Sequence, residues 1–193
     1  MATVVVATGN PGKLAELKDY LQALKWTLSL KPSEIEVEET GETFIENARL
    51  KASEVAIATK SWAIADDSGL SVAALNGAPG VYSARYGHSD ADRINRVLRE
   101  LGDEPNRQAE FVCALALARP DGTIALETEG HCPGIILTAG QGAGGFGYDP
   151  IFYVKAQGKT FAEMTAAEKE RYSHRAVAFE QLMPALRKID LES

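Results

Sequence analysis

Residues 62–70, Trp-Ala-Ile-Ala-Asp-Asp-Ser-Gly-Leu, decide how the rest of the chain is interpreted. A short apolar run leads directly into two adjacent carboxylates, Asp66 and Asp67, which are followed by Ser68 and Gly69. This pattern predicts a buried strand that delivers the two acids to a turn at its C-terminal end. Ligands bind at such strand ends in α/β sheets. Adjacent carboxylates repel each other, so the pair favours a cation site, and an ordinary surface turn is the alternative.

Length and composition describe an ordinary globular protein. The chain has 193 residues, enough for one domain, with 45% hydrophobic and 24% charged residues. Its net charge of -7 argues against a nucleic-acid-binding surface. Two cysteines without CxxC spacing, and no secretory leader, predict a reduced cytoplasmic protein. No apolar run approaches the ~20 residues that span a bilayer, so no membrane partner is expected.

The N-terminal segment predicts a strand, a loop and a helix. Residues 3–7 are mostly β-branched, and leucines recur at helical spacing from Leu14 to Leu24. The loop between them, residues 8–13, contains two glycines and ends in Lys13. Backbone N–H groups at a helix N-terminus, together with a lysine charge, suit a phosphate. The loop does not match the P-loop pattern, and an ordinary strand-to-helix turn with a solvated lysine is the alternative.

Capping signatures predict the remaining helices. The pattern of Ser or Thr followed three residues later by Asp or Glu occurs at 43–46, 89–92 and 165–168. These boxes are expected to open one helix through Thr59, one that ends near Gly102, and one that includes residues 169–171. Residues 109–118 and 123–130 predict a hairpin around Pro120-Asp121-Gly122.

A final helix is expected from His174 to Ile189, capped by Ser173 and kinked or loosened at Pro184. On the helix that ends at Thr59, Arg49 and Lys51 are each either a surface cation or a side chain turned inward to a phosphate.

Residues 140–145 contain a literal GxGxxG pattern, which alone would indicate a dinucleotide site. The following Phe146-Gly147-Tyr148-Asp149-Pro150 cannot open a helix, so a dinucleotide site is rejected. The glycines favour a close backbone approach to a ligand, and Phe146 and Tyr148 offer ring faces on which a base could stack. A flexible loop that ends in two core aromatics is the alternative.

Six motifs, in one order from residue 3 to about 189, resemble the non-standard purine nucleoside triphosphate pyrophosphatases, the inosine triphosphatase-like or dITP/XTP pyrophosphatase family. The motifs are Thr8-Gly9-Asn10 with Lys13, Glu38-Glu39-Thr40-Gly41 before Thr43-Phe44-Ile45-Glu46-Asn47-Ala48, Ala65-Asp66-Asp67-Ser68-Gly69, Gly80-Val81-Tyr82-Ser83-Ala84-Arg85, Gly144-Gly145-Phe146-Gly147-Tyr148-Asp149-Pro150 and Ser173-His174-Arg175.

The resemblance implies an α/β fold with a long mixed central β-sheet flanked by helices, in a single domain over residues 1–193. It also implies two lobes with an active-site cleft between them. The implied activity is Mg2+-dependent hydrolysis of dITP, ITP and XTP to the monophosphate and pyrophosphate. The implied protein is a cytoplasmic homodimer that cleanses the nucleotide pool and binds neither nucleic acid nor membranes.

The resemblance also assigns roles to matching residues. Asp67 would be the base for the attacking water, with Asp66 beside it as the other catalytic candidate, and Glu38 and Asp67 would hold Mg2+. The residues expected to bind the substrate are Thr8, Gly9, Asn10, Pro11, Gly12, Lys13, Lys51, Ser68, Phe146, Gly147, Tyr148, Asp149, Lys169, His174 and Arg175. The alternatives are a pyrophosphatase for modified pyrimidine triphosphates and a nucleotide-binding regulator without hydrolysis.

Overall fold

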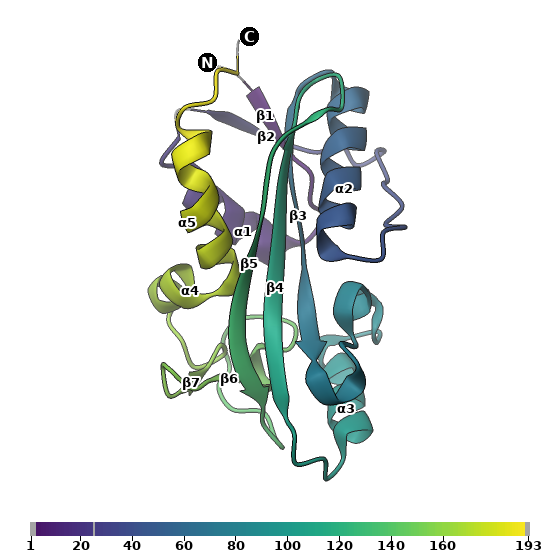
Figure 1. Cartoon of the computed structure of the whole chain (residues 1–193), viewed down its shortest axis with the longest axis vertical. Helices are drawn as coiled ribbons and strands as arrows, with labels where there is room; N and C mark the ends of the chain where they lie inside the picture. Colours follow the sequence, from purple (N-terminus) through teal and green to yellow (C-terminus); the bar gives the residue numbers. More distant parts are fainter. Residues whose placement is uncertain (1–2, 25, 192–193) are drawn as a thin grey trace. The chain divides into compact units, whose positions relative to one another are not determined.

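A computed structural model describes residues 3–24 and 26–191, with only the backbone described at Pro11. Within these residues, seven strands form one sheet in the order β2-β1-β3-β4-β5-β6-β7. The strands are β1 (Thr3–Val6), β2 (Thr27–Leu30), β3 (Trp62–Val72), β4 (Gln108–Ala118), β5 (Ile124–Ile136), β6 (Phe152–Val154) and β7 (Lys159–Thr160). The α-helices are α1 (Pro11–Leu21), α2 (Phe44–Thr59), α3 (Asp90–Leu101), α4 (Ala166–Tyr172) and α5 (His174–Leu186). Figure 1 shows their arrangement along the chain.

The sheet is mixed, as predicted. β1 pairs in parallel with β2 and β3, whereas β6 pairs antiparallel with β5 and β7. The predicted α/β fold with a mixed sheet flanked by helices is therefore confirmed. The described chain divides into two compact units, which come from Met1–Asp67, Ala114–Glu129 and Ala178–Ser193 (unit 1) and from Ser68–Cys113 and Gly130–Val177 (unit 2). The active-site cleft expected between two lobes stays a prediction.

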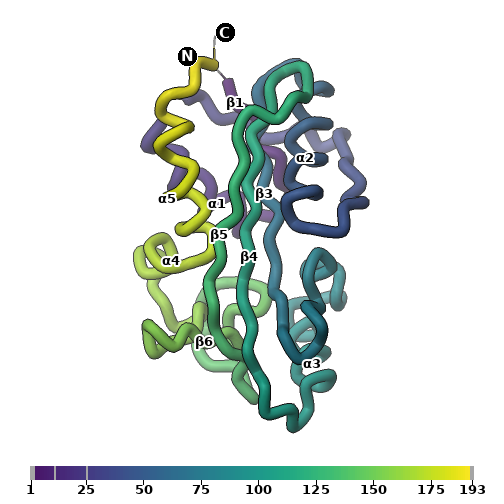
Figure 2. Tube along the Cα trace, in the orientation of Figure 1, coloured from purple at the N-terminus to yellow at the C-terminus, as the bar shows by residue number. Residues whose placement is uncertain are grey.

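In unit 1, small side chains allow α2 to pack closely on the sheet. Alanines of α2, β3 and β4, together with two valines and the alanine that follows β1, form one buried cluster (Val5, Ala7, Ala48, Ala52, Val55, Ala56, Ala63, Ala65, Ala114, Ala116 and Ala118). On another side of this unit, α1 lies beside the C-terminal part of α5 (Figure 2). Tyr20 of α1 stacks on Phe179 of α5 with ring centroids 4.6 Å apart.

In unit 2, larger aromatic and aliphatic side chains fill the core. Phe111 of β4 contacts Phe152 at a centroid distance of 4.7 Å and Phe161 at 5.5 Å. Val97 and Leu101 of α3 belong to the same buried cluster. Within the described residues, no helix is long and apolar enough to cross a membrane.

The helix caps predicted from short sequence patterns are found at the start of α2, α3 and α4. Thr43 and Thr165 form reciprocal capping boxes with Glu46 and Glu168, and α2 and α4 begin directly after the two threonines. Ser89 caps α3, whose last residue precedes Gly102. The predicted hairpin is confirmed as β4 and β5, although β5 continues to Ile136 because its last residues pair with β6.

The turn predicted after the two carboxylates is wrong. β3 extends from Trp62 to Val72, so residues 66–69 lie inside a strand. The backbone N–H of Leu70 donates to the hydroxyl of Ser83 at 2.9 Å. A Cβ atom at Gly69 would lie 2.3 Å from Ser83 Oγ, so this glycine permits a close approach and does not form a turn.

The final helix is shorter than predicted. α5 ends at Leu186, so Ile189 lies beyond it. Pro184 stays inside the helix, two residues before its end. Proline has no backbone N–H and cannot donate within the helix, which is consistent with termination soon after this residue.

Candidate functional site

Unit 1 contains a buried group of acids and lysines on β3, α1 and α2. Asp66 and Asp67 of β3 are 1% and 5% exposed. Lys13, in the first turn of α1, lies 3.3 Å from Asp66 Oδ2. Lys51 of α2 turns inward, and its Nζ lies 2.8 Å from Asp67 Oδ1 and 2.8 Å from Glu39 Oε1. The structure thus brings together four of the residues expected at the site and adds Glu39.

The electrostatics of this group follow from its burial. Burial alone would lower the pKa of Lys51, but the Asp67, Asp66 and Glu39 carboxylates outweigh burial and raise the pKa. Burial also raises the pKa of Asp67, and the charges of Lys51 and Lys13 offset only part of that rise. Asp67 is therefore a more basic carboxylate than an exposed aspartate and is held in place by a charged partner.

The group also contains oxygen donors suited to a hard divalent cation. Asp67 Oδ2 is buried and has no hydrogen-bond partner among the described residues. Glu39 shares Lys51 with Asp67, whereas Glu38, the expected metal ligand, is exposed. Within the described residues, no group of three or more His, Cys, Asp or Glu side chains could hold a metal ion. A cation here would therefore need ligands from the substrate or from water, which is the usual situation of Mg2+ bound to a nucleotide.

The expected phosphate loop is shorter than the sequence indicated. α1 begins at Pro11, so Gly12 and Lys13 belong to its first turn. The side chain of Asn10 caps the helix, and its Oδ1 accepts hydrogen bonds from the backbone N–H groups of Gly12 at 2.9 Å and Lys13 at 3.2 Å. The Asn10 N–H in turn donates to Thr8 Oγ1 at 3.2 Å. Two of the amides expected to meet a phosphate therefore already have an acceptor, while the Lys13 ammonium faces Asp66.

Unit 2 contains the remaining predicted residues. The guanidinium of Arg175, which is 1% exposed, donates to Ser68 Oγ at 3.0 Å. His174 is buried and stacks on Phe111 with a centroid distance of 4.8 Å and an interplanar angle of 16°. Both residues begin α5, directly after the capping Ser173. The structure thus places Ser68 and Arg175 in contact although 107 positions separate them in the chain.

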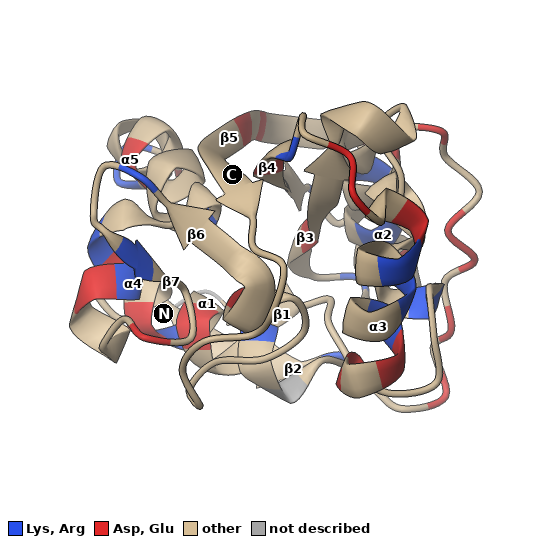
Figure 3. Cartoon of the chain, turned by 90° about the horizontal axis from the view of Figure 1, so that it is seen from below, with Lys and Arg blue, Asp and Glu red and all other residues tan. Residues whose placement is uncertain are grey.

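The glycine-rich loop leads to a charged pair beside an aromatic ring. Asp149 is 4% exposed, and its Oδ2 lies 2.8 Å from Lys169 Nζ of α4. The same oxygen accepts a hydrogen bond from the Phe146 N–H at 3.0 Å. Lys169 Nζ also lies 4.9 Å from the centroid of the Phe146 ring. Charges of both signs gather on α4, as Figure 3 shows.

The two aromatic rings of this loop differ in their surroundings. Tyr148 is 4% exposed, belongs to the core of unit 2, and donates its hydroxyl to the Ser83 carbonyl at 2.8 Å. Phe146 is only partly buried. Tyr148 is therefore a core aromatic, as one alternative anticipated, and Phe146 is the ring that remains for stacking on a base.

Three residues in contact with the predicted site were not expected there: Glu39, Ser83 and Asp90. Asp90 accepts a hydrogen bond from the backbone N–H of Gly147 at 2.7 Å. Glu39 and Ser83 both lie within quoted motifs, so proximity to a motif was the available signal. Asp90 gave no signal in the sequence beyond its position next to Ser89, the cap of α3.

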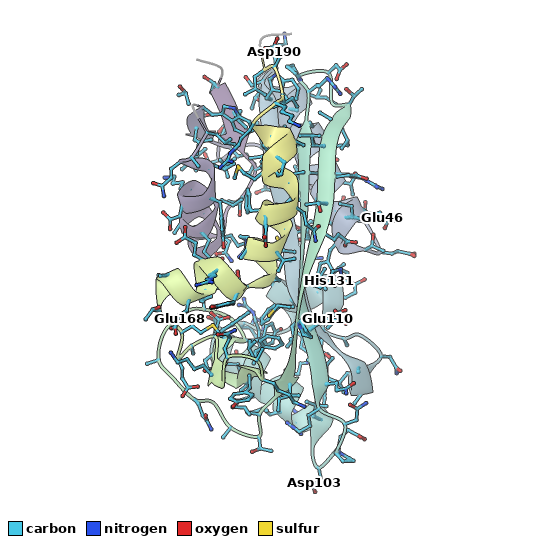
Figure 4. The ribbon with its side chains drawn as sticks, turned by 60° about the vertical axis from the view of Figure 1, so that its left-hand side comes forward. Glu46, Asp103, Glu110, His131, Glu168 and Asp190 are labelled. Atoms are coloured by element: carbon cyan, nitrogen blue, oxygen red, sulfur yellow. The ribbon has the colours of Figure 1, made fainter. Side chains whose placement is uncertain are left out.

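A separate cavity of about 560 Å3 lies in unit 2. Its lining includes Ser71, Gln108, Glu110, Pro133, Ile135 and Lys155. Glu110 also faces His131 on β5, with 3.2 Å between Oε2 and Nδ1 (Figure 4). None of the predicted site residues lines this cavity, so it is not where the expected chemistry would take place.

Comparison with known proteins confirms the resemblance that the six motifs indicated. A model of the Ham1 family matches residues 4–185. A dITP/XTP pyrophosphatase of Nostoc sp. is 63% identical over 183 residues, which cover 95% of this chain and 93% of that protein. A dITP/XTP pyrophosphatase of Synechocystis sp. is 58% identical, with 95% and 94% covered.

Solved structures of related proteins have the same fold as this chain. A HAM1 protein from Coxiella burnetii superposes with a TM-score of 0.90 at 42% identity, covering 98% of this chain and 100% of that one. A nucleoside-triphosphatase / dITP/XTP pyrophosphatase from Mycobacterium abscessus gives a TM-score of 0.77 at 42% identity, with 96% and 100% covered. Sequence and structure together establish that the chain belongs to the Ham1 family.

Proposed function

We propose that this protein is a Mg2+-dependent pyrophosphatase that hydrolyses dITP, ITP and XTP to the nucleoside monophosphate and pyrophosphate. Two observations support this proposal. The relatives with high identity over nearly their full length are dITP/XTP pyrophosphatases. The single structural observation that carries the proposal is the buried Asp67, held by Lys51 and lying on the same strand as an Asp66 paired with Lys13.

The lysines suit the charge of the substrate. A triphosphate carries several negative charges, and its cleavage depends mainly on positioning and charge neutralisation. Lys13 and Lys51 supply two ammonium groups next to the two carboxylates of β3. The residues of the loop 8–12 would position the phosphates, with Asn10 maintaining the first turn of α1 from which Lys13 projects.

Asp67 and an acidic neighbour would hold Mg2+, which when bound would neutralise phosphate charge and bind water. We assign the second ligand to Glu39 or Glu38. Glu39 is favoured because it already shares an ion-pair partner with Asp67. The buried Asp67 Oδ2, which has no hydrogen-bond partner among the described residues, offers the oxygen that such a cation requires.

Asp67 would also accept the proton of the attacking water. Its carboxylate is buried and lies 2.8 Å from Lys51 Nζ, so it is held in a fixed position to accept that proton. Asp66, on the neighbouring position of β3, would hold Lys13 toward the phosphates.

We assign the base of the nucleotide to the residues of unit 2. Phe146 offers a partly exposed ring, and the Asp149–Lys169 pair offers an acceptor and a donor beside it. Hypoxanthine and xanthine carry a 6-oxo acceptor where adenine has an amino donor. Arg175 carries only N–H donors, one of which binds Ser68, and we assign it as a donor to this 6-oxo group. A site built on such donors rejects adenine because a buried donor would then face another donor.

The homodimer, the cytoplasmic location and the cleansing of the nucleotide pool are also part of the proposal. Each rests on the resemblance of the motifs to this family, and size-exclusion chromatography with light scattering would test the dimer directly.

The substitution Asp67→Asn tests the catalytic assignment. It should reduce kcat for ITP roughly 10²- to 10⁴-fold, the usual contribution of a general base, with an unchanged circular dichroism spectrum. Asp19→Asn, on an exposed position of α1, is the matched control and should keep full activity. Removal of divalent ions with EDTA should abolish turnover, and added Mg2+ should restore it. Near-normal turnover by Asp67→Asn would refute the assignment.

A further inference from the structure

The loop that carries Phe146 is held at three points within unit 2. At its start, the Gly144 N–H donates to the Ala162 carbonyl at 3.0 Å. At its end, the buried Tyr148 hydroxyl donates to the Ser83 carbonyl. Between these points, the Gly147 N–H donates to Asp90 Oδ2 at 2.7 Å. The two outer contacts fix the ends of the loop, and the middle contact holds the residue that follows Phe146.

The peptide between Phe146 and Gly147 is fixed from both sides. Its N–H donates to Asp90, and its carbonyl accepts a hydrogen bond from the Asp149 N–H at 3.3 Å. The Phe146 N–H also donates to Asp149 Oδ2 at 3.0 Å. These bonds fix the backbone on either side of the Phe146 side chain, and the backbone determines where the ring can point.

No packing replaces the Asp90 contact. Gly147 has a positive φ of 62°, and a Cβ atom placed there would find no described heavy atom within 4 Å. The space beside Gly147 is therefore empty of described atoms, and the described interaction that holds this residue is its hydrogen bond to the Asp90 carboxylate. Hydrogen bonds to charged acceptors are stronger than neutral ones.

Asp90 is itself held in place. It is the first residue of α3, and its Oδ1 accepts a hydrogen bond from Arg93 Nη1 at 2.6 Å, one turn along the same helix. The carboxylate is thus oriented by Arg93 on one oxygen and binds Gly147 with the other.

We propose that Asp90 is a positioning residue for nucleotide binding: by holding the Gly147 amide, it fixes the Phe146 ring where the purine base stacks. This inference rests on the proposed function, because it assigns Phe146 to the base. Asp90 touches neither the carboxylates of β3 nor their lysines in any described contact. Its loss should therefore raise KM and leave kcat nearly unchanged.

The test compares Asp90→Ala, Asp90→Asn and the matched control Asp92→Ala. Both aspartates lie in the first turn of α3 and affect the helix dipole alike, but the described contact to the loop belongs to Asp90. Asp90→Ala should raise KM for ITP roughly tenfold, the ratio that corresponds to one charged hydrogen bond, with kcat changed less than about twofold. Asp90→Asn keeps an oxygen acceptor and should restore most of the wild-type KM.

Hydrogen exchange measured by mass spectrometry gives a second readout that needs no nucleotide. Peptides covering residues 144–149 should exchange faster in Asp90→Ala than in Asp92→Ala, and at the wild-type rate in Asp90→Asn. The proposal is overturned if Asp90→Ala and Asp92→Ala give the same KM and the same exchange, or if Asp90→Ala lowers kcat at constant KM. A failure of the proposed function would instead appear as no turnover of ITP by the wild-type protein, and the exchange data would still decide whether Asp90 holds the loop.

Discussion

Replacement of Lys51 by methionine should destabilise the protein far more than replacement of Arg49, although both cations lie on α2 and pair with acids. The Lys51 and Asp67 side chains are 13% and 7% exposed, whereas Arg49 and Glu127 are 45% and 36% exposed. Removing one partner of a buried pair leaves a buried charge and costs about 3–5 kcal/mol. An exposed pair contributes at most about 1 kcal/mol. In a chain of this length, the Lys51→Met loss corresponds to a fall in Tm of roughly 6–20 °C.

The assay is urea unfolding followed by circular dichroism, with EDTA present so that no divalent cation replaces the missing ammonium. Methionine keeps the apolar stem of the lysine, so the comparison isolates the charge. If the free energies of unfolding of Lys51→Met and Arg49→Met agree within about 0.5 kcal/mol, burial does not control the strength of these pairs and the reasoning is refuted.

Two further predictions concern unit 2. Gly69→Ala places a Cβ atom 2.3 Å from Ser83 Oγ and should lower the free energy of unfolding, measured with urea, by about 1–3 kcal/mol. The control is Gly9→Ala, where a Cβ atom finds no described atom within 4 Å, and its free energy of unfolding should not change measurably. Equal effects of the two substitutions would contradict the contact between Gly69 and Ser83. The Lys159 hydrogen bond and the Thr165 amide lower the pKa of Glu168, labelled in Figure 4, from 4.5 to about 2. The wild-type protein should therefore be more stable to unfolding than Glu168→Gln, fully so above pH 4.5, and this difference in stability should disappear as the pH falls toward about 2. A difference in stability that does not depend on pH would contradict the lowered pKa of Glu168.

Local signals in the sequence predicted local structure. The threonines that cap α2 and α4 lie three residues from their glutamate partners, so each capping box could be recognised from a few letters. The mixed sheet followed from the order of six motifs and could not be derived from any one of them.

The errors came from contacts between distant residues. Ser68 and Gly69 are typical turn residues, but both are part of β3 because Ser83, fourteen positions after Gly69, binds the next backbone amide. Likewise Asp90 directly follows the helix-capping Ser89 in the sequence, and its bond to Gly147 spans 57 positions. No local pattern contains such information.

At the candidate site too, the sequence predicted the local pattern but not every contact between distant residues. The sequence predicted Asp66 and Asp67 as a pair beside lysines, and the structure places Lys13 and Lys51 against them. It could not distinguish Glu38 from Glu39, because two adjacent acids in an extended segment differ only in the direction of their side chains. The structure shows that Glu39 is the residue that faces Lys51.

The most direct test of the proposed function is the product released from ITP, XTP, GTP and ATP, with and without Mg2+, by an assay that separates pyrophosphate from orthophosphate. The proposal predicts pyrophosphate from ITP and XTP, only with the metal, and much slower release from ATP, whose 6-amino donor would face the donors of the site. Orthophosphate as the product, equal turnover of all four purines, or turnover of modified pyrimidine triphosphates alone would contradict it.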